Sequence, residues 1–220
     1  MNRLRIHMLP PVNPVPRLAS LPMEKARHWI SPYEGVGDSA PVSVFLTQTA
    51  CNQAVRHASS DLDNEVGGVL VGNWCTDPET NRQFIVITAT LPARFTQQGS
   101  VFLTFTQDSL VDLHEKIEQE YPEDVIVGWY HTHPRMGVFL SHYDAWLHNH
   151  FFPEPWQVAL VMEPHTEAGG FFVRQADGVL EPSRYYGFYE LEDGTGENIL
   201  QWKNLQQEPT GNEKKGVDPQ

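Results

Sequence analysis

The sequence predicts a mixed α/β domain of about 150 residues, and three observations lead to this expectation. Apolar residues recur at helical spacing in two segments of the chain, and a third segment has a helix start near Ser141 and a stop before Pro153. Between these segments lie short apolar or alternating runs bounded by turn-forming residues, which is the pattern of β-strands. With 220 residues and a hydrophobic content of 40%, the chain is long enough to bury one sizeable core.

The first half of this domain is expected to begin with a strand at 42–46 and a helix over 49–59, because small and apolar residues share one face of that helix. The spacing then changes to that of strands at 68–74 and 83–91. A turn-rich stretch separates these two strands, which predicts a hairpin. A further strand is expected at 101–105.

The second half is expected to contain two more helices. The first spans 107–121, where an apolar stripe ends before Pro122, and the second starts near Ser141 and stops before Pro153. Runs of apolar and aromatic residues predict the remaining strands at 124–131, 156–162, 171–175 and 184–191.

Two long extensions flank the domain, which we place at residues 41–191. Residues 1–40 contain six prolines and predict an extended arm. Two alternatives stay equally open for this arm. Its apolar residues favour packing against the domain or a partner, whereas its prolines fit a free leader. Residues 192–220 are expected to form a polar C-terminal tail that is largely disordered.

Charge and composition exclude several functional classes. Fifteen Lys and Arg residues against 28 Asp and Glu residues give a net charge of −13, which repels phosphate backbones and argues against nucleic-acid binding. No apolar run reaches the roughly 18 to 20 residues of a membrane helix, so no membrane association is expected. Cys51 and Cys75 are interpreted as free thiols of a cytoplasmic protein, with a single disulfide as the alternative.

The segment with the clearest chemistry is His131-Thr132-His133-Pro134, at the end of an apolar strand. Residues i and i+2 of a strand face the same side, so the two histidines can direct their imidazoles at one point. Asp144, in the first turn of the next expected helix, can add a carboxylate oxygen. Three protein ligands leave the fourth tetrahedral position of a zinc ion open for water, as in catalytic zinc sites.

Two further residues are candidates for proton transfer and for stabilising an oxyanion at such a site. Zinc lowers the pKa of its water to about 7, and Glu65 can take that proton and pass it to a leaving amine. Two glycines follow Glu65 and would let the backbone come close to the site. Ser141 would offer its hydroxyl to a developing oxyanion.

Each of these residues also has a simpler interpretation. Ser141 and Asp144 have the spacing of a helix capping box, which needs no catalysis. Glu65 follows Asp61 and Asp63 and would fit a solvated acidic loop. Paired histidines on a strand are often surface residues.

Taken together, the residues resemble the signature of the JAMM metalloproteases, also called MPN+ or JAB domains. That signature is an upstream Glu, then His-x-His-Pro, six residues, Ser, two residues and Asp, and every element is present between Glu65 and Asp144. The stretches EVGGVLVG at 65–72 and VGWY at 127–130 are also similar to the family. The resemblance covers residues 42–191.

The resemblance implies an MPN/JAB (cytidine-deaminase-like) fold, with a central mixed sheet flanked by about three helices. It implies that His131, His133 and Asp144 bind one catalytic Zn²⁺ ion, that Glu65 is the general base and acid, and that Ser141 stabilises the tetrahedral intermediate. Active members of the family cleave isopeptide or peptide bonds after the Gly-Gly tail of ubiquitin or a ubiquitin-like protein, without a covalent intermediate.

The expected function is therefore that of a zinc-dependent isopeptidase or peptidase. Its partners would be a ubiquitin-like modifier with a Gly-Gly tail and the enzymes that activate or conjugate this modifier. Two alternatives stay open: a non-catalytic adaptor that uses the fold, arm and tail for assembly, and a zinc hydrolase acting on adducts of a sulfur-carrier protein.

Two further expectations follow from the resemblance. By position, residues 95–105 correspond to a variable insertion that helps to hold the modifier's tail. Some relatives bind a second, structural zinc through Cys and His residues. Because no cysteine lies near His142, His148 and His150, these histidines are expected at the surface or around the first site.

Overall fold

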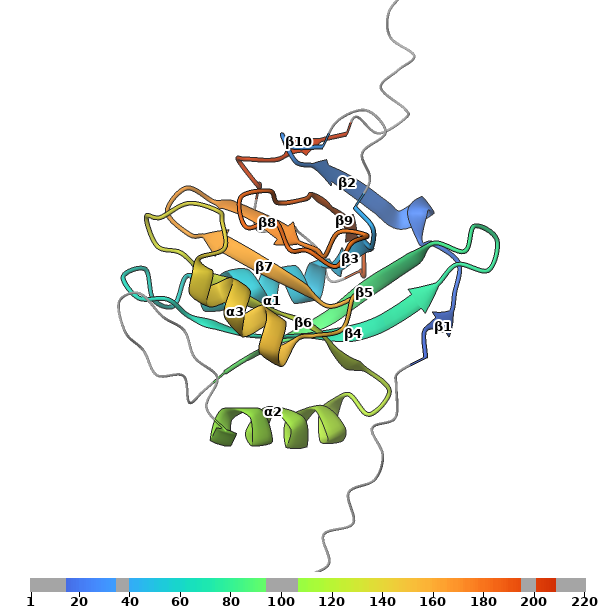
Figure 1. Cartoon of the computed structure of the whole chain (residues 1–220), viewed down its shortest axis with the longest axis horizontal. Helices are drawn as coiled ribbons and strands as arrows, with labels where there is room; N and C mark the ends of the chain where they lie inside the picture. Colours follow the sequence, from blue (N-terminus) through green and yellow to red (C-terminus); the bar gives the residue numbers. More distant parts are fainter. Residues whose placement is uncertain (1–14, 35–39, 94–106, 195–200, 209–220) are drawn as a thin grey trace, which may run out of the picture.

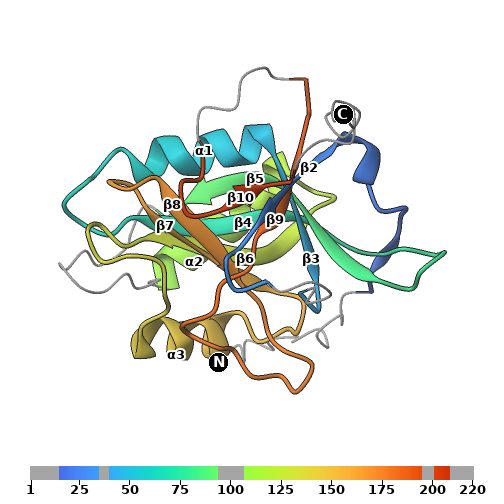
Figure 2. The same ribbon diagram turned by 90° about the horizontal axis from the view of Figure 1, so that it is seen from above.

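A curled, mixed β-sheet with helices on both faces forms the body of the protein (Figures 1 and 2). The computed structural model describes residues 15–34, 40–93, 107–194 and 201–208. The helices are α1 (Gln48–Ala58), α2 (Gln107–Glu120) and α3 (His142–Phe151), with a short 3₁₀ turn at Met23–Lys25. The strands are β1 (Arg17–Leu18), β2 (Ala26–Ile30), β3 (Ser43–Thr47), β4 (Gly67–Thr76), β5 (Gln83–Pro92), β6 (Val125–Thr132), β7 (Val158–Glu163), β8 (Ala168–Phe172), β9 (Phe188–Leu191) and β10 (Gln206–Gln207).

The strand order is β10-β2-β9-β3-β5-β4-β6-β7-β8, and β1 pairs with the far end of β4. The pairs β3–β5, β3–β9 and β6–β7 are parallel, whereas β4 is antiparallel to both β5 and β6. The mixed α/β fold with three helices is thus confirmed, and β4 and β5 form the expected hairpin. Within the described helices, none has both the length and the apolar character to cross a membrane.

Side chains of β6 alternate between the two faces of the sheet, as the period of two requires. The Tyr130 hydroxyl lies 2.8 Å from Nδ1 of His57 on α1. The neighbouring Trp129 donates its indole N–H to Nδ1 of His148 on α3, at 3.0 Å. The helices α1 and α3 therefore cover opposite faces of the sheet (Figure 2). His131, two residues after Trp129, lies on the α3 face and stacks on its indole.

Close packing explains the glycines at the start of β4 and in β8. A Cβ atom at Gly68 would lie 2.0 Å from the Leu91 carbonyl oxygen of β5. Gly68 therefore allows the close pairing of β4 with β5, and the preceding Gly67 is paired with His131 of β6. The strand β8 begins earlier than the expected 171–175, and a Cβ atom at its Gly169 would lie 2.2 Å from the ring of Trp202.

The sheet extends beyond 41–191 on both sides. The strands β1 and β2 come from the proline-rich arm, and the buried Trp29 donates its indole N–H to Glu190 Oε2 at 2.8 Å. At the other end, Trp202 and Leu205 are buried and β10 pairs with β2. The expectation of a disordered tail is therefore wrong for 201–208, because these two apolar side chains bury enough surface to order it.

Some expectations lie outside the described residues, namely those for 1–14, for the strand at 101–105, for the insertion at 95–105 and for 209–220. Cys51 and Cys75 are both free and buried, in agreement with the thiol interpretation.

Candidate metal centre

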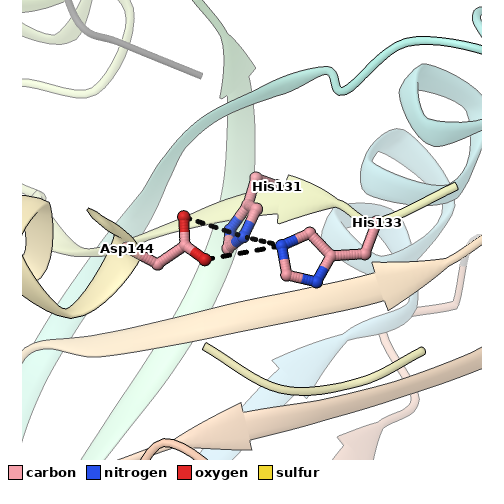
Figure 3. Close-up of side chains that lie close together, drawn as sticks. All are labelled: His131, His133 and Asp144. Atoms are coloured by element: carbon pink, nitrogen blue, oxygen red, sulfur yellow. Dashed lines mark hydrogen bonds and ion pairs between the residues drawn. The ribbon is translucent and has the colours of Figure 1, made fainter. Parts of the chain in front are cut away.

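Three buried side chains from two elements converge on one point. His131 is the penultimate residue of β6, His133 follows the strand, and Asp144 lies in the first turn of α3. Figure 3 shows the two imidazoles and the carboxylate pointing toward one another. The two Nε2 atoms are 2.9 Å apart, and each lies 3.5 Å from one of the Asp144 carboxylate oxygens. No more than 4% of the surface of any of the three residues is exposed.

The donor set and its spacing fit a zinc ion. Bonds of about 2.0 to 2.2 Å in a tetrahedral site separate the ligand atoms by about 3.3 Å. The distances of 2.9 and 3.5 Å lie on either side of this value. Two imidazoles and one carboxylate are the ligand types of catalytic zinc sites, and three of them leave a fourth position for water. It is the one cluster of this kind within the described ranges.

The neighbours of β6 in the sheet hold the histidines in register. His131 is paired with Gly67 of β4 on one side and with Val161 of β7 on the other. Beyond the end of the strand, the His133 N–H still donates to the Met162 carbonyl oxygen at 2.8 Å. Both histidines therefore stand on backbone that is bonded to neighbouring strands, which limits the movement of their side chains.

Asp144 is oriented by the start of its own helix. The Ser141 N–H donates to Asp144 Oδ2 at 2.7 Å, and the Asp144 N–H donates to Ser141 Oγ at 3.1 Å, which completes a capping box. The simpler interpretation of this pair is thus present in the structure. It does not exclude a chemical role, because the serine accepts in the cap and retains its hydroxyl proton.

The surroundings of Asp144 and His131 favour the protonation states in which these side chains bind a metal ion. Burial alone would raise the pKa of Asp144, but hydrogen bonds with His131 and His133 hold it well below its ordinary range. Burial lowers the pKa of His131 and outweighs the opposite effect of Asp144. An ionised carboxylate and a neutral imidazole are the forms that bind metal ions.

Glu65 joins the cluster from the residue pair that precedes β4. Its Oε1 lies 3.8 Å from His133 Nε2, and only 5% of its surface is exposed. The next residue, Val66, is clamped to Thr132: the Val66 N–H donates to the Thr132 hydroxyl and the Thr132 N–H donates to the Val66 carbonyl, both at 2.9 Å. Glu65 is therefore a buried member of the cluster and not part of a solvated acidic loop.

Other residues around the centre were not predicted from the sequence. The Trp129 ring stacks on His131 with a centroid distance of 4.5 Å and an interplanar angle of 6°. The Phe139 ring lies 4.8 Å from His133. Because Trp129 is two residues before His131 on a strand, the period of two could have placed it there. Phe139 lies in a loop, where no periodicity could have indicated its position.

A buried carboxylate supports the loop that follows His133. Glu163, at the end of β7, accepts the Arg135 N–H at 3.0 Å, and Arg135 has a positive φ of 61°. The same carboxylate accepts the N–H groups of His165 and Thr166 in the next turn. These bonds stabilise a backbone conformation that is costly for a residue with a side chain.

The three histidines of α3 differ in environment. His142 and His150 are exposed, whereas His148 is fully buried against Trp129. None of them belongs to a second metal cluster within the described residues. A cavity of about 430 Å³ between α2, the start of β6 and the end of α3 is lined by none of the candidate site residues.

Residues 39–152 match the protein family described as "JAB1/Mov34/MPN/PAD-1 ubiquitin protease". The chain belongs to this family. The matched range includes Glu65, His131, His133, Ser141 and Asp144, so the resemblance of the sequence to the JAMM/MPN+ family is confirmed.

Relatives of known name are distant. The NAD(+) hydrolase TcpA of Theionarchaea archaeon (strain DG-70-1) is 32% identical over 129 residues, which are 58% of this chain and 36% of that protein. The ubiquitin carboxyl-terminal hydrolase RPN11 of Saccharomyces cerevisiae is 25% identical over 173 residues, 77% of this chain and 54% of that protein. The chain thus spans between about a third and a half of the length of these relatives.

A solved structure supports the fold. The solution structure of protein DSY2949 from Desulfitobacterium hafniense matches with a TM-score of 0.51 and 16% sequence identity. The match covers 73% of this chain and 95% of that chain. It shows a shared fold.

Proposed function

We propose that this member of the JAB/MPN family is a zinc-dependent isopeptidase or peptidase that cleaves after the C-terminal Gly-Gly of ubiquitin or a ubiquitin-like protein. The observation that carries the proposal is the convergence of two imidazoles and one carboxylate, with the Glu65 carboxylate 3.8 Å from His133. The family description and the name of the RPN11 relative support the substrate class.

Each residue has a distinct role in the proposed reaction. His131, His133 and Asp144 would hold the zinc ion. When bound in such an open site, zinc supplies a Lewis acid and a water of lowered pKa. Glu65 takes up the proton of the attacking water and returns it to the leaving amine. Ser141 donates its hydroxyl proton to the charge that develops on the substrate carbonyl oxygen.

A cysteine nucleophile is not part of the proposal. Burial, with a smaller contribution from Glu190, raises the pKa of the Cys51 thiol to about 12. Burial also raises the pKa of Cys75. A thiolate is the nucleophilic form of cysteine, so neither side chain is activated for attack.

Metal content is the first test. We expect one zinc per chain by elemental analysis of the untagged protein and none in the His131→Ala, His133→Ala double variant. Metal-replete protein is then incubated with linear fusions and isopeptide conjugates of ubiquitin-like modifiers. Glu65→Gln should keep zinc and fold but lose turnover, whereas Asp63→Asn, an exposed neighbour, should retain it. Wild-type enzyme that leaves every fusion uncut, while a positive control cuts them, would contradict the proposal.

The same experiments separate the alternatives. A non-catalytic adaptor need not hold stoichiometric zinc, and its assembly would be unchanged by Glu65→Gln. A hydrolase of sulfur-carrier adducts would process small adducts of a carrier protein but leave protein conjugates intact. NAD⁺ is included among the substrates because of the TcpA relative. The modifier, its activating and conjugating enzymes and a cytoplasmic location remain predictions.

A further inference from the structure

Three aromatic rings form a continuous row that ends at the candidate metal centre. His148, on α3, accepts the indole N–H of Trp129 at 3.0 Å. The indole in turn stacks on the His131 imidazole, with ring centroids 4.5 Å apart and planes inclined by 6°. All three side chains have 0% exposed surface. The position of the His148 ring therefore affects that of the His131 ring through close contacts with Trp129.

Among the described residues, none gives His131 the hydrogen bond that ordinarily fixes a metal-binding imidazole. A ligating histidine ordinarily donates its second ring N–H to a carboxylate, a carbonyl or water, which sets the orientation of the ring. Nδ1 of His131 is buried and has no hydrogen-bond partner among the residues that the structure describes. The near-parallel indole of Trp129 covers the face of this ring and holds it in its plane, while the His133 ring meets it at an angle of 75°.

The indole is held by a directional bond of its own. Indole Nε1–H can only donate, so Nδ1 of His148 is the acceptor and this imidazole is neutral, with its proton on Nε2. Burial, followed by the charge of Arg174, lowers the pKa of His148 to about 3, which agrees with this assignment. Phe152 packs nearly parallel to the indole, with ring centroids 5.9 Å apart. The bond to His148 therefore selects the rotation of the Trp129 ring.

We propose that His148 is a positioning residue for the metal ligand His131 and that it acts through the Trp129 indole. The inference rests on the proposed function, in which His131 binds zinc. It also gives α3 a double role. The helix supplies Asp144 as a ligand and, one turn later on the same face, the imidazole that orients a second ligand.

The test measures zinc affinity of full-length variants by competition with a chelator. His148→Leu removes the acceptor, whereas His148→Gln retains an oxygen that can accept the indole N–H. We expect His148→Leu to weaken zinc binding by about 10- to 100-fold, the usual effect of losing such a supporting contact. His148→Gln should restore most of the affinity. His150→Leu, an exposed histidine on the same helix, is the matched control and should bind zinc like the wild type.

A double-mutant cycle separates positioning from general loosening of the core. Trp129→Phe keeps an aromatic ring beside His131 but removes the N–H, so it should weaken zinc binding by itself. In that background, His148→Leu should have little further effect, because the two residues act through one bond. Absorption spectra of the Co²⁺-substituted proteins report ligand geometry, and we expect a changed spectrum for His148→Leu and a wild-type spectrum for His148→Gln.

The outcomes are distinguishable. If folded His148→Leu has wild-type zinc affinity and an unchanged Co²⁺ spectrum, the inference is overturned and the proposed function is not. The same holds if His148→Leu weakens zinc binding in the Trp129→Phe background as much as it does in the wild type. If His148→Leu does not fold, Trp129→Phe decides, and unchanged zinc affinity there would overturn the inference. Wild-type protein that binds no zinc would overturn this inference together with the proposed function.

Discussion

Thr132 connects the candidate base to the strand that carries the two histidines, and its hydroxyl offers a sharp test of that connection. The side chain is fully buried, and its oxygen accepts the Val66 N–H at 2.9 Å. In Thr132→Val a methyl group replaces the hydroxyl. The Val66 N–H then remains buried without an acceptor, while the reciprocal backbone bond from the Thr132 N–H to Val66 is kept.

The magnitude follows mainly from the loss of this acceptor, because the hydroxyl's own donation to the Val66 carbonyl is long, at 3.4 Å, and that carbonyl keeps the Thr132 N–H. A buried donor left without an acceptor costs about 1 to 3 kcal/mol. In a protein of this size each kcal/mol lowers the melting temperature by about 2 to 4 °C, so we expect a decrease of about 2 to 12 °C. Because Glu65 precedes the released amide, turnover should fall by about 10- to 100-fold, the range in which small misplacements of reacting groups act.

The assay combines calorimetry of metal-free protein with zinc analysis and turnover of a cleaved modifier fusion. Zinc stoichiometry should stay at the wild-type level, because the three ligands are untouched. Thr132→Ser retains the hydroxyl and should recover most of the stability and activity. Our reasoning would be refuted if Thr132→Val melts at the wild-type temperature, or if the serine variant is as strongly impaired as the valine variant.

Three further predictions concern the ligands and the buried titratable groups. Asp144→Ala should lose zinc, whereas Asp144→Asn keeps an oxygen for the helix cap and should weaken zinc with little loss of stability; normal zinc affinity in both would exclude Asp144 as a ligand. Burial and the charge of Arg174 lower the pKa of His148 from 6.5 to about 3, so between these pH values the unfolded chain binds a proton that the folded ring does not. The free energy of unfolding should therefore decrease by about 1.4 kcal/mol per pH unit as the pH falls through that window. In urea titrations, the free energy of unfolding of His148→Gln should depend less steeply on pH. Because burial raises the pKa of Cys51 to about 12, a thiol reagent at about pH 8 should label it only after unfolding, and rapid labelling of the native protein would contradict this.

Local periodicity is the reason why part of the site could be predicted. Strand geometry alone places His131 and His133 on one face, and the capping pattern places Asp144 in a first helical turn. The structure shows both arrangements. The approach of Glu65 is different, because it depends on the register in which β4 pairs with β6. No local pattern specifies that register, so the sequence could only suggest Glu65 from the two glycines that follow it and from the family resemblance.

Long-range packing is the reason why other features were not predicted. The Gly169 position is explained only by the Trp202 ring that lies against it, more than thirty residues later in the chain. The burial of His148 likewise depends on Trp129 from another element. In the sequence, no periodic pattern around Trp202 or His148 indicates which distant residue each of them packs against.

The sequence by itself determined the helices, most strands and the spacing of the metal-binding signature, because these depend on side-chain periodicity over a few residues. The tertiary structure alone decided how arm and tail join the sheet, how closely Glu65 approaches the histidines, and which aromatic rings support them. These features depend on strand register and on contacts between distant segments. Their free energies are realised only when the sheet has assembled, so no short stretch of the chain encodes them.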